Sequence, residues 1–465
     1  MTGRSFARAV GRDRQQTCCR PSKGEKALVS ISHNLLFIML FSLGFMRPQL
    51  DFSSLAVVPS DGLAVALGSC WLAAIAFGQK MPRWHAAYWF FAAYFCAMVV
   101  SAICADAPFM EFLPRLAGEA YLIVLPVIVM AMVDNLDILR FACLGWLCGT
   151  SAVIMLGVVA LLLTLVDPTN TLLVYVQHHF GSLPLGPFIR FRLAFENPNM
   201  LGAYLSASLM VALLAQSSGW IHRWVAVVLL SGISLVLAMT FSAGIGGALL
   251  AAGTWGWLRL RETKHRIALL LLCLGIASGL AFVVAQVVTP VAYPDPAFAL
   301  HIPYADFTLF PSARWMAWRD ALATFQTSPF TGHGIGRSVA DVAWVEPGGA
   351  HVLLLDAHNV LLNLAAECGA IGLAAIIAIM IFVWRAPSRW HHATLICQWA
   401  QIAFAIGILD VLAYQGIGGA FEDARFVWVM MGLLLAASRL PGTTSDGNGD
   451  VCPGEAEGTS TAAAH

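Results

Sequence analysis

The residues best placed to do chemistry lie in the stretch 356–372, DAHNVLLNLAAECGAIG. His358 and Asn359 stand where a long connecting segment enters an apolar run. Imidazole titrates near neutral pH and is a common general base. Glu367 follows two helical turns later, where contact with lipid would be costly, so we expect it to face the protein interior. A helix-capping His358 is the alternative, but the neighbouring Asp356, Asn359 and Glu367 favour a chemical role.

A second group of candidates lies in the stretch 186–204, GPFIRFRLAFENPNMLGAY. Asn197 and Asn199 flank a proline, which is a strong helix-start signal because Asn caps helices and Pro fits their first turn. The positive end of that helix would lie near Arg190 and Arg192, and such places bind anions. An ordinary capped membrane helix is the alternative interpretation.

Further basic and glycine residues lie between these two groups. The stretch 313–327, ARWMAWRDALATFQT, has apolar residues at helical spacing, with Arg314 and Arg319 away from that stripe. Arg forms paired, charge-assisted bonds with phosphate, so several together would suit a pyrophosphate; pairing with nearby acids is the alternative for each. The GHGIG sequence at 332–336 offers backbone N–H groups to an oxyanion, but alone it favours a simple turn.

The composition indicates that these candidates are carried by a membrane protein. The chain has 465 residues, of which 59% are hydrophobic and 11% charged, against about 25% charged in soluble domains. A span needs about 20 apolar residues. The lengths of the apolar runs predict an all-α, polytopic protein with about twelve transmembrane helices, at residues 28–46, 60–78, 86–104, 117–133, 140–165, 198–216, 223–240, 243–258, 267–288, 358–383, 396–415 and 426–438.

Basic residues predict the orientation of this bundle. If residues 1–27 form a basic cytoplasmic segment, most Lys and Arg residues fall on inward segments, as the positive-inside rule requires. The bundle then spans 28–440, with one large, folded outward loop at 289–357 and a disordered cytoplasmic tail at 441–465. The basic residues left outside are all Arg: Arg47, Arg115, Arg190, Arg192, Arg314, Arg319, Arg337 and Arg425. Arg425 lies in FEDAR (421–425), where local ion pairing is expected.

Several classes of function are excluded by missing patterns. The chain has no Cys or His spacing typical of a metal site, so we expect no metal and no structural disulfide. It has no Walker loop, no GxSxG and no dinucleotide-binding glycine pattern, and we expect no cofactor. A net charge of zero gives no global attraction for nucleic acid. The energy for any reaction must then come from the substrate.

The order of these motifs resembles the O-antigen ligase and polymerase superfamily of bacterial envelopes. The matching elements cover about residues 185–440: Arg190 before FENPN, Arg314 before Trp318, Pro329 before GHG, and His358-Asn359 before ECGAIG. The resemblance implies a metal-independent glycosyltransferase embedded in the inner membrane, with its active face in the periplasm. The donor would be an undecaprenyl-pyrophosphate-linked glycan. The acceptor would be lipid A–core oligosaccharide in a ligase, or another lipid-linked repeat in a polysaccharide polymerase.

The resemblance also implies roles for individual residues. His358 would be the base for the acceptor hydroxyl, while Arg190 and Arg314 would hold the leaving pyrophosphate. The remaining candidates for binding pyrophosphate or glycan are Arg192, Arg319, Asn197, Asn199, Asn359 and Glu367. The chain departs from the family at two positions, with Ala243 in place of a common Arg and Leu193 in place of a common Gly. The first departure removes one expected phosphate contact, for which Arg192 or Arg319 could compensate.

Two other functions are also compatible with the sequence: a polysaccharide polymerase, and a transporter or flippase. One outward loop dominates, which favours ligase over polymerase. A transporter or flippase would carry polar and charged residues within several mid-bundle helices. Here the mid-helix regions are mostly free of charge and the polar groups gather at the outward ends, which favours surface chemistry over translocation.

Overall fold

The computed structural model describes residues 23–76, 84–259, 300–302, 307–309 and 313–440, with short gaps at 48, 53–54, 184–185, 346–350, 389–393, 420 and 422–423, and single positions between 265 and 276. Residues 1–22 and 441–465, which hold most of the predicted cytoplasmic head (1–27) and the whole predicted tail, lie outside this part. The long helices are α1 (Lys23–Ser42), α2 (Pro59–Ala76), α3 (Ala87–Cys104), α4 (Phe109–Met132), α5 (Leu136–Val166), α7 (Pro198–Ser217), α8 (Arg223–Thr240), α9 (Gly244–Arg259), α12 (Val360–Arg385), α13 (Leu395–Leu409) and α14 (Arg425–Ala437).

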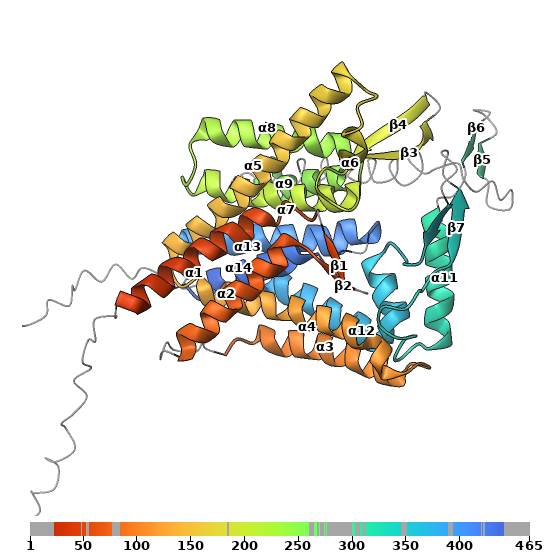
Figure 1. The fold of residues 1–465 in the computed structure, drawn as a ribbon, viewed down its shortest axis with the longest axis horizontal. Helices are drawn as coiled ribbons and strands as arrows, with labels where there is room; N and C mark the ends of the chain where they lie inside the picture. Colours follow the sequence, from red (N-terminus) through yellow and green to blue (C-terminus); the bar gives the residue numbers. More distant parts are fainter. Residues whose placement is uncertain are drawn as a thin grey trace, which may run out of the picture.

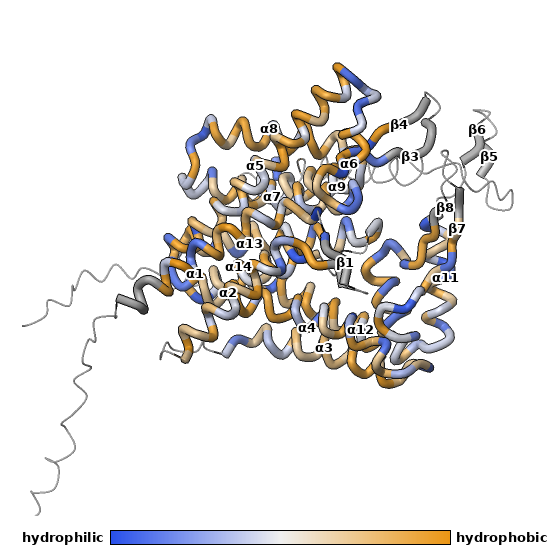
Figure 2. The backbone as a smooth tube through the Cα atoms, in the orientation of Figure 1, coloured by the Kyte–Doolittle hydropathy of each residue, from blue (hydrophilic) through white to orange (hydrophobic). Residues whose placement is uncertain are grey.

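The helices confirm a mostly helical, polytopic membrane protein. Within the described residues, eight helices are long and apolar enough to cross a membrane, and the segments Leu28–Ser42 and Arg425–Ala437 are shorter apolar helices. Hydrophobic residues run along most of the bundle in Figure 2. The span predicted at 267–288 falls almost wholly outside the described residues. The total of about twelve therefore stays a prediction.

Small hairpins depart from the all-α prediction. The described residues contain four two-stranded antiparallel sheets: β1 (Leu50–Phe52) with β2 (Leu55–Val57), β3 (Gln177–Leu183) with β4 (Gly186–Phe191), β5 (Leu300–Ile302) with β6 (Phe307–Leu309), and β7 (Val342–Val345) with β8 (His351–Leu354). Most of them gather, with α11 (Ala313–Thr327), at one end of the bundle (Figure 1). Period-2 patterns this short are hard to distinguish from loops in a sequence.

Helix α7 is the most enclosed of the candidate spans, because 78% of its most apolar stretch is buried inside the protein. It begins where the Asn-Pro-Asn signal predicted, because Asn197 caps it by accepting a hydrogen bond from the backbone N–H of Met200 (2.9 Å). On its buried side, Tyr204 stacks on Trp146 of α5, and the indole N–H of Trp146 donates to Ser208 (2.8 Å). The cap therefore starts a rigid central element directly beside Arg190.

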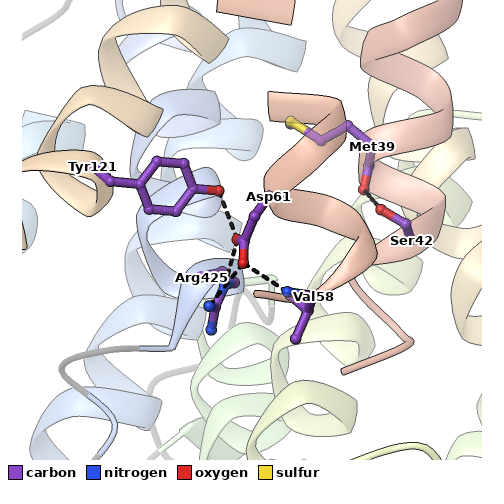
Figure 3. A network of polar contacts seen from close by, with 6 residues as sticks. All are labelled: Met39, Ser42, Val58, Asp61, Tyr121 and Arg425. Atoms are coloured by element: carbon purple, nitrogen blue, oxygen red, sulfur yellow. Dashed lines mark hydrogen bonds and ion pairs between the residues drawn. The ribbon is translucent and has the colours of Figure 1, made fainter. Parts of the chain in front are cut away.

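A buried ion pair joins three helices (Figure 3). Arg425, at the start of α14, donates from Nε to Asp61 Oδ1 (2.5 Å) and from Nη2 to Asp61 Oδ2 (2.9 Å). The hydroxyl of Tyr121 in α4 and the backbone N–H of Val58 also donate to this carboxylate, at 2.8 and 2.9 Å. The local partners expected for Arg425 in FEDAR, residues 422 and 423, lie outside the described residues. Asp61, a partner that the structure does show, is 364 positions away.

We expect Asp61→Ala to destabilise the bundle by about 3 kcal/mol, because breaking a buried pair leaves an unpaired charge. The figure is at the low end of the usual range because the Arg425 side chain is 21% exposed. Thermal unfolding in detergent would measure the loss. The double variant Asp61→Leu with Arg425→Leu should recover most of it, since apolar replacement of both partners is often neutral. Equal stability of Asp61→Ala and the wild type would contradict this role.

Candidate functional site

His358 lies on the turn that leads into α12, and Asp356 holds its ring. The backbone of His358 is left-handed, with φ of 45°. Both its backbone N–H (3.2 Å) and its ring Nδ1 bond to Oδ1 of Asp356. The side chain of His358 is 35% exposed, and within the described residues Nε2 has no partner. This arrangement orients the imidazole and leaves Nε2 able to accept a proton from a ligand.

Asp356 carries a negative charge at neutral pH. Burial alone would raise the pKa of its carboxyl, but the hydrogen bonds and charge of His358, together with the charge of Arg314, lower it overall. A carboxylate bonded to Nδ1 stabilises the imidazolium that forms when Nε2 takes a proton. From the sequence, Asp356 was recognised only as a neighbour of His358 and was not predicted as a site residue.

Arg190 is a buried cation anchored by the protein. It lies in β4, is only 3% exposed, and donates from Nε to the carbonyl of Thr240 (2.7 Å) and from Nη2 to Asn199 Oδ1 (2.7 Å). Thr240 ends α8, three residues before Ala243. The anchor of Arg190 is therefore in the stretch where the family's common Arg is missing.

Arg314, in the first turn of α11, is the second cation of the site. Burial, and next the charge of Arg314, lower the pKa of Arg190, so the two guanidinium groups interact. Burial also lowers the pKa of Arg314, while the charge of Asp356 opposes that shift. Within the described part of the chain, the Arg314 guanidinium has no hydrogen-bond partner. Two positive charges held together in a partly enclosed place favour an anion between them.

The predicted Asn residues have partners within the protein. Asn197 caps α7, and Asn199 orients Arg190. Asn359 caps α12, accepting from the backbone N–H groups of Leu361 and Leu362 at 3.1 Å each, and it donates to the carbonyl of Ile417 (3.4 Å). These amides position the helix ends that carry the charged residues.

Glu367 holds the GHGIG turn against α12. Its Oε2 accepts from the backbone N–H of Gly336 (3.1 Å), its Oε1 accepts from Asn363 (3.1 Å), and its carbonyl accepts from Gly334 (3.0 Å). Gly332 has φ of 75°, and a Cβ there would lie 2.2 Å from the carbonyl oxygen of Glu367, so only glycine fits. The backbone N–H groups of His333, Gly334 and Gly336 bond to α12, and that of Gly332 donates to the carbonyl of Ser328 (3.0 Å), as in the simple turn that the sequence favoured.

The contacts described for Arg192 and Arg319 lie elsewhere. Arg192 donates to the carbonyl of Val174 (3.1 Å). Burial, and next the charge of Arg47, lower the pKa of Arg192. Arg319 pairs with Asp320 (3.5 Å) on an exposed face of α11. None of these contacts joins the group formed by Arg190, Arg314, Asp356 and His358.

The backbone of Leu193, one of the two departures from the family pattern, is left-handed. Leu193 has φ of 49°, a conformation that glycine adopts without strain. The glycine common at this position in the family suits that geometry. Leu193 is 1% exposed, so burial of its side chain offsets part of the strain.

Comparison with known proteins agrees with the geometry. The fold defines a polytopic, mostly helical membrane protein with a charged group gathered at one end. A family model described as O-Antigen ligase matches residues 225–377, a range that holds Arg314, Asp356, His358 and Glu367. This match confirms the resemblance to the O-antigen ligase superfamily that the motifs predicted. No curated protein is found to match the chain. Within the described residues, no three His, Cys, Asp or Glu side chains form a group that could hold a metal ion.

Proposed function

We propose that the protein transfers a glycan from undecaprenyl pyrophosphate to a periplasmic acceptor, with lipid A–core oligosaccharide as the acceptor. The family suggests a ligase-like or polymerase-like membrane glycosyltransferase. One observation carries the finer proposal: Asp356, which holds His358, also interacts with the charge of Arg314, and Arg314 in turn interacts with the buried Arg190. A base beside a pyrophosphate-binding pair is what glycan transfer requires.

The chemistry follows from these positions. Nε2 of His358 takes the proton of the acceptor hydroxyl as its oxygen attacks the anomeric carbon of the donor. The new glycosidic bond forms while the bond from that carbon to the pyrophosphate oxygen breaks. Arg190 and Arg314 stabilise the charge that develops on the leaving undecaprenyl pyrophosphate. Asp356 stabilises the imidazolium until its proton passes to water, and no nucleotide is required.

The position of the site supports a periplasmic location. The positive-inside rule puts the outward ends of the helices opposite the basic head. Most of the hairpins gather with α11 at one end of the bundle (Figure 1), and Arg190 and Arg314 belong to β4 and α11. The lipid tail of the donor can then stay in the bilayer while its pyrophosphate reaches the two Arg residues.

The glycolipid profile of a deletion strain tests the proposed function. We expect loss of long glycan from lipid A–core, with lipid-linked polymer accumulating. Single repeat units on the core would instead show a polymerase. An unchanged envelope profile with altered uptake of a solute would contradict glycan transfer and favour a transporter.

A further inference from the structure

A buried carboxyl that the proposed reaction does not use lies behind the site. Asp410 follows α13 and begins a π-helical segment, Asp410–Tyr414, that continues into a 3₁₀ turn, Gln415–Ile417. Such π-helical turns inside helices are often found at functional sites. Asp410 is 6% exposed and lies in a candidate span, an exception to the nearly charge-free mid-helix regions noted in the sequence.

Two donors from different segments hold this carboxyl. Ser206 of α7 donates to Oδ2 (2.5 Å), and the side-chain amide of Gln415 donates to the same oxygen (2.6 Å). Gly247 of α9 leaves room for the group, since a Cβ there would lie 2.4 Å from Oδ1 and 2.8 Å from Nε2 of Gln415. Within the described residues Asp410 has no cationic partner, so its hydrogen-bond geometry, not an ion pair, accounts for its place.

The segment held by Asp410 reaches the candidate site at its other end. The carbonyl of Ile417 accepts from Asn359, which caps α12 immediately after His358. Gly418 packs against Arg314, where a Cβ would lie 3.3 Å from Nη1. The backbone N–H of Gly418 donates to the carbonyl of Gln415 (2.8 Å). Residues 415–418 therefore connect the carboxyl to the surface on which the Arg314 guanidinium rests.

We propose that Asp410 is a positioning residue for glycan transfer. By holding Gln415, it fixes the 415–418 segment and so places the guanidinium of Arg314 and the capped start of α12. Arg314 makes no hydrogen bond in the described part of the chain, so its position depends on this packing. The inference rests on the proposed function, in which Arg314 binds the pyrophosphate.

Two substitutions at Asp410 separate geometry from charge. Asp410→Ala removes the acceptor, and we expect kcat/KM for the lipid-linked donor to fall about 10–100-fold, the scale for a small misplacement of a binding group. Asp410→Asn keeps an oxygen that accepts both bonds, and its kcat/KM should stay within about threefold of wild type. Similar large losses in both variants would overturn the proposal.

A matched pair of variants tests which hydrogen bond matters. Gln415→Leu cuts the connection to the 415–418 segment and should resemble Asp410→Ala. Ser206→Ala removes only the bond to α7 and should leave transfer close to wild type. If the two variants lower kcat/KM equally, Asp410 acts by joining helices, and the proposal is wrong.

A double-mutant cycle with Arg314→Gln decides whether the effect passes through Arg314. In the Arg314→Gln background, Asp410→Ala should cause little further loss, whereas additive losses would overturn the proposal. If Asp410→Ala fails to insert, Gly418→Ala tests the same link from the other end, and it should lower donor kcat/KM without lowering Tm. If Arg314→Gln alone leaves donor kcat/KM unchanged, the pyrophosphate role in the proposed function is wrong. The two failures are therefore distinguishable.

Discussion

His358→Ala is expected to abolish glycan transfer while the protein still inserts into the membrane. Loss of a general base lowers rates by about 10²–10⁴-fold, and Asp356 orients the ring so that only Nε2 is available to the acceptor. The measurement is transfer of a lipid-linked glycan to acceptor by the purified protein, together with capped lipopolysaccharide in a complemented null strain. Wild-type product from the Ala variant would remove His358 from the mechanism.

Two control variants make this prediction specific. His358→Asn suits the left-handed backbone, φ of 45°, because Asn tolerates that region better than most residues; it should fold normally and remain inactive. His333→Ala removes an exposed imidazole from the GHGIG turn while its backbone bond to Ala366 stays, and it should be fully active. Equal losses in His333→Ala and His358→Ala would indicate a structural effect.

Asp356→Asn should lower transfer without preventing ring orientation. The amide can still bond to the ring, but it has no charge to stabilise the imidazolium. We therefore expect an intermediate loss of about 10²-fold, within the range for support of a general base.

Arg314→Gln has the second largest expected effect. Removing a charge-assisted contact costs roughly 1.5–3 kcal/mol, or about 10–150-fold in rate if the contact acts in the transition state. Arg314 makes no hydrogen bond in the described residues and is close enough to Arg190 for their charges to repel. Its removal should therefore lower donor turnover while leaving Tm unchanged or higher, which is typical of a functional residue held at a cost to stability.

Arg190→Gln should lose a similar amount of activity but behave differently in stability. Arg190 is bonded to Thr240 and Asn199, so its replacement also loosens β4 from the ends of α8 and α7. Arg319→Gln, on the exposed face of α11, is the matched control and should leave donor turnover unchanged. Unchanged turnover in both Arg190→Gln and Arg314→Gln would remove the pair from the site.

Local sequence signals were enough to predict the helical bundle, the starts of two helices and one turn. The apolar runs defined a polytopic helical bundle, and Asn197 with its following proline defined the start of α7. The helix beginning after His358-Asn359 and the turn at GHGIG were also readable. Each signal depends on residues within about one or two helical turns, where hydrogen bonding, capping and hydrophobic period follow directly from the chain.

Only the tertiary structure decided which distant residues meet. Asp61 pairs with Arg425 across 364 positions. Arg190 and Arg314 are close enough to interact, although the sequence around neither residue predicts the contact. Asp356 was visible beside His358, yet its interaction with Arg314 was not. Asp410 had no local pattern at all, since Ser206 and Gly247 come from other helices. Such contacts follow from how the helices pack, which no local spacing in the sequence specifies.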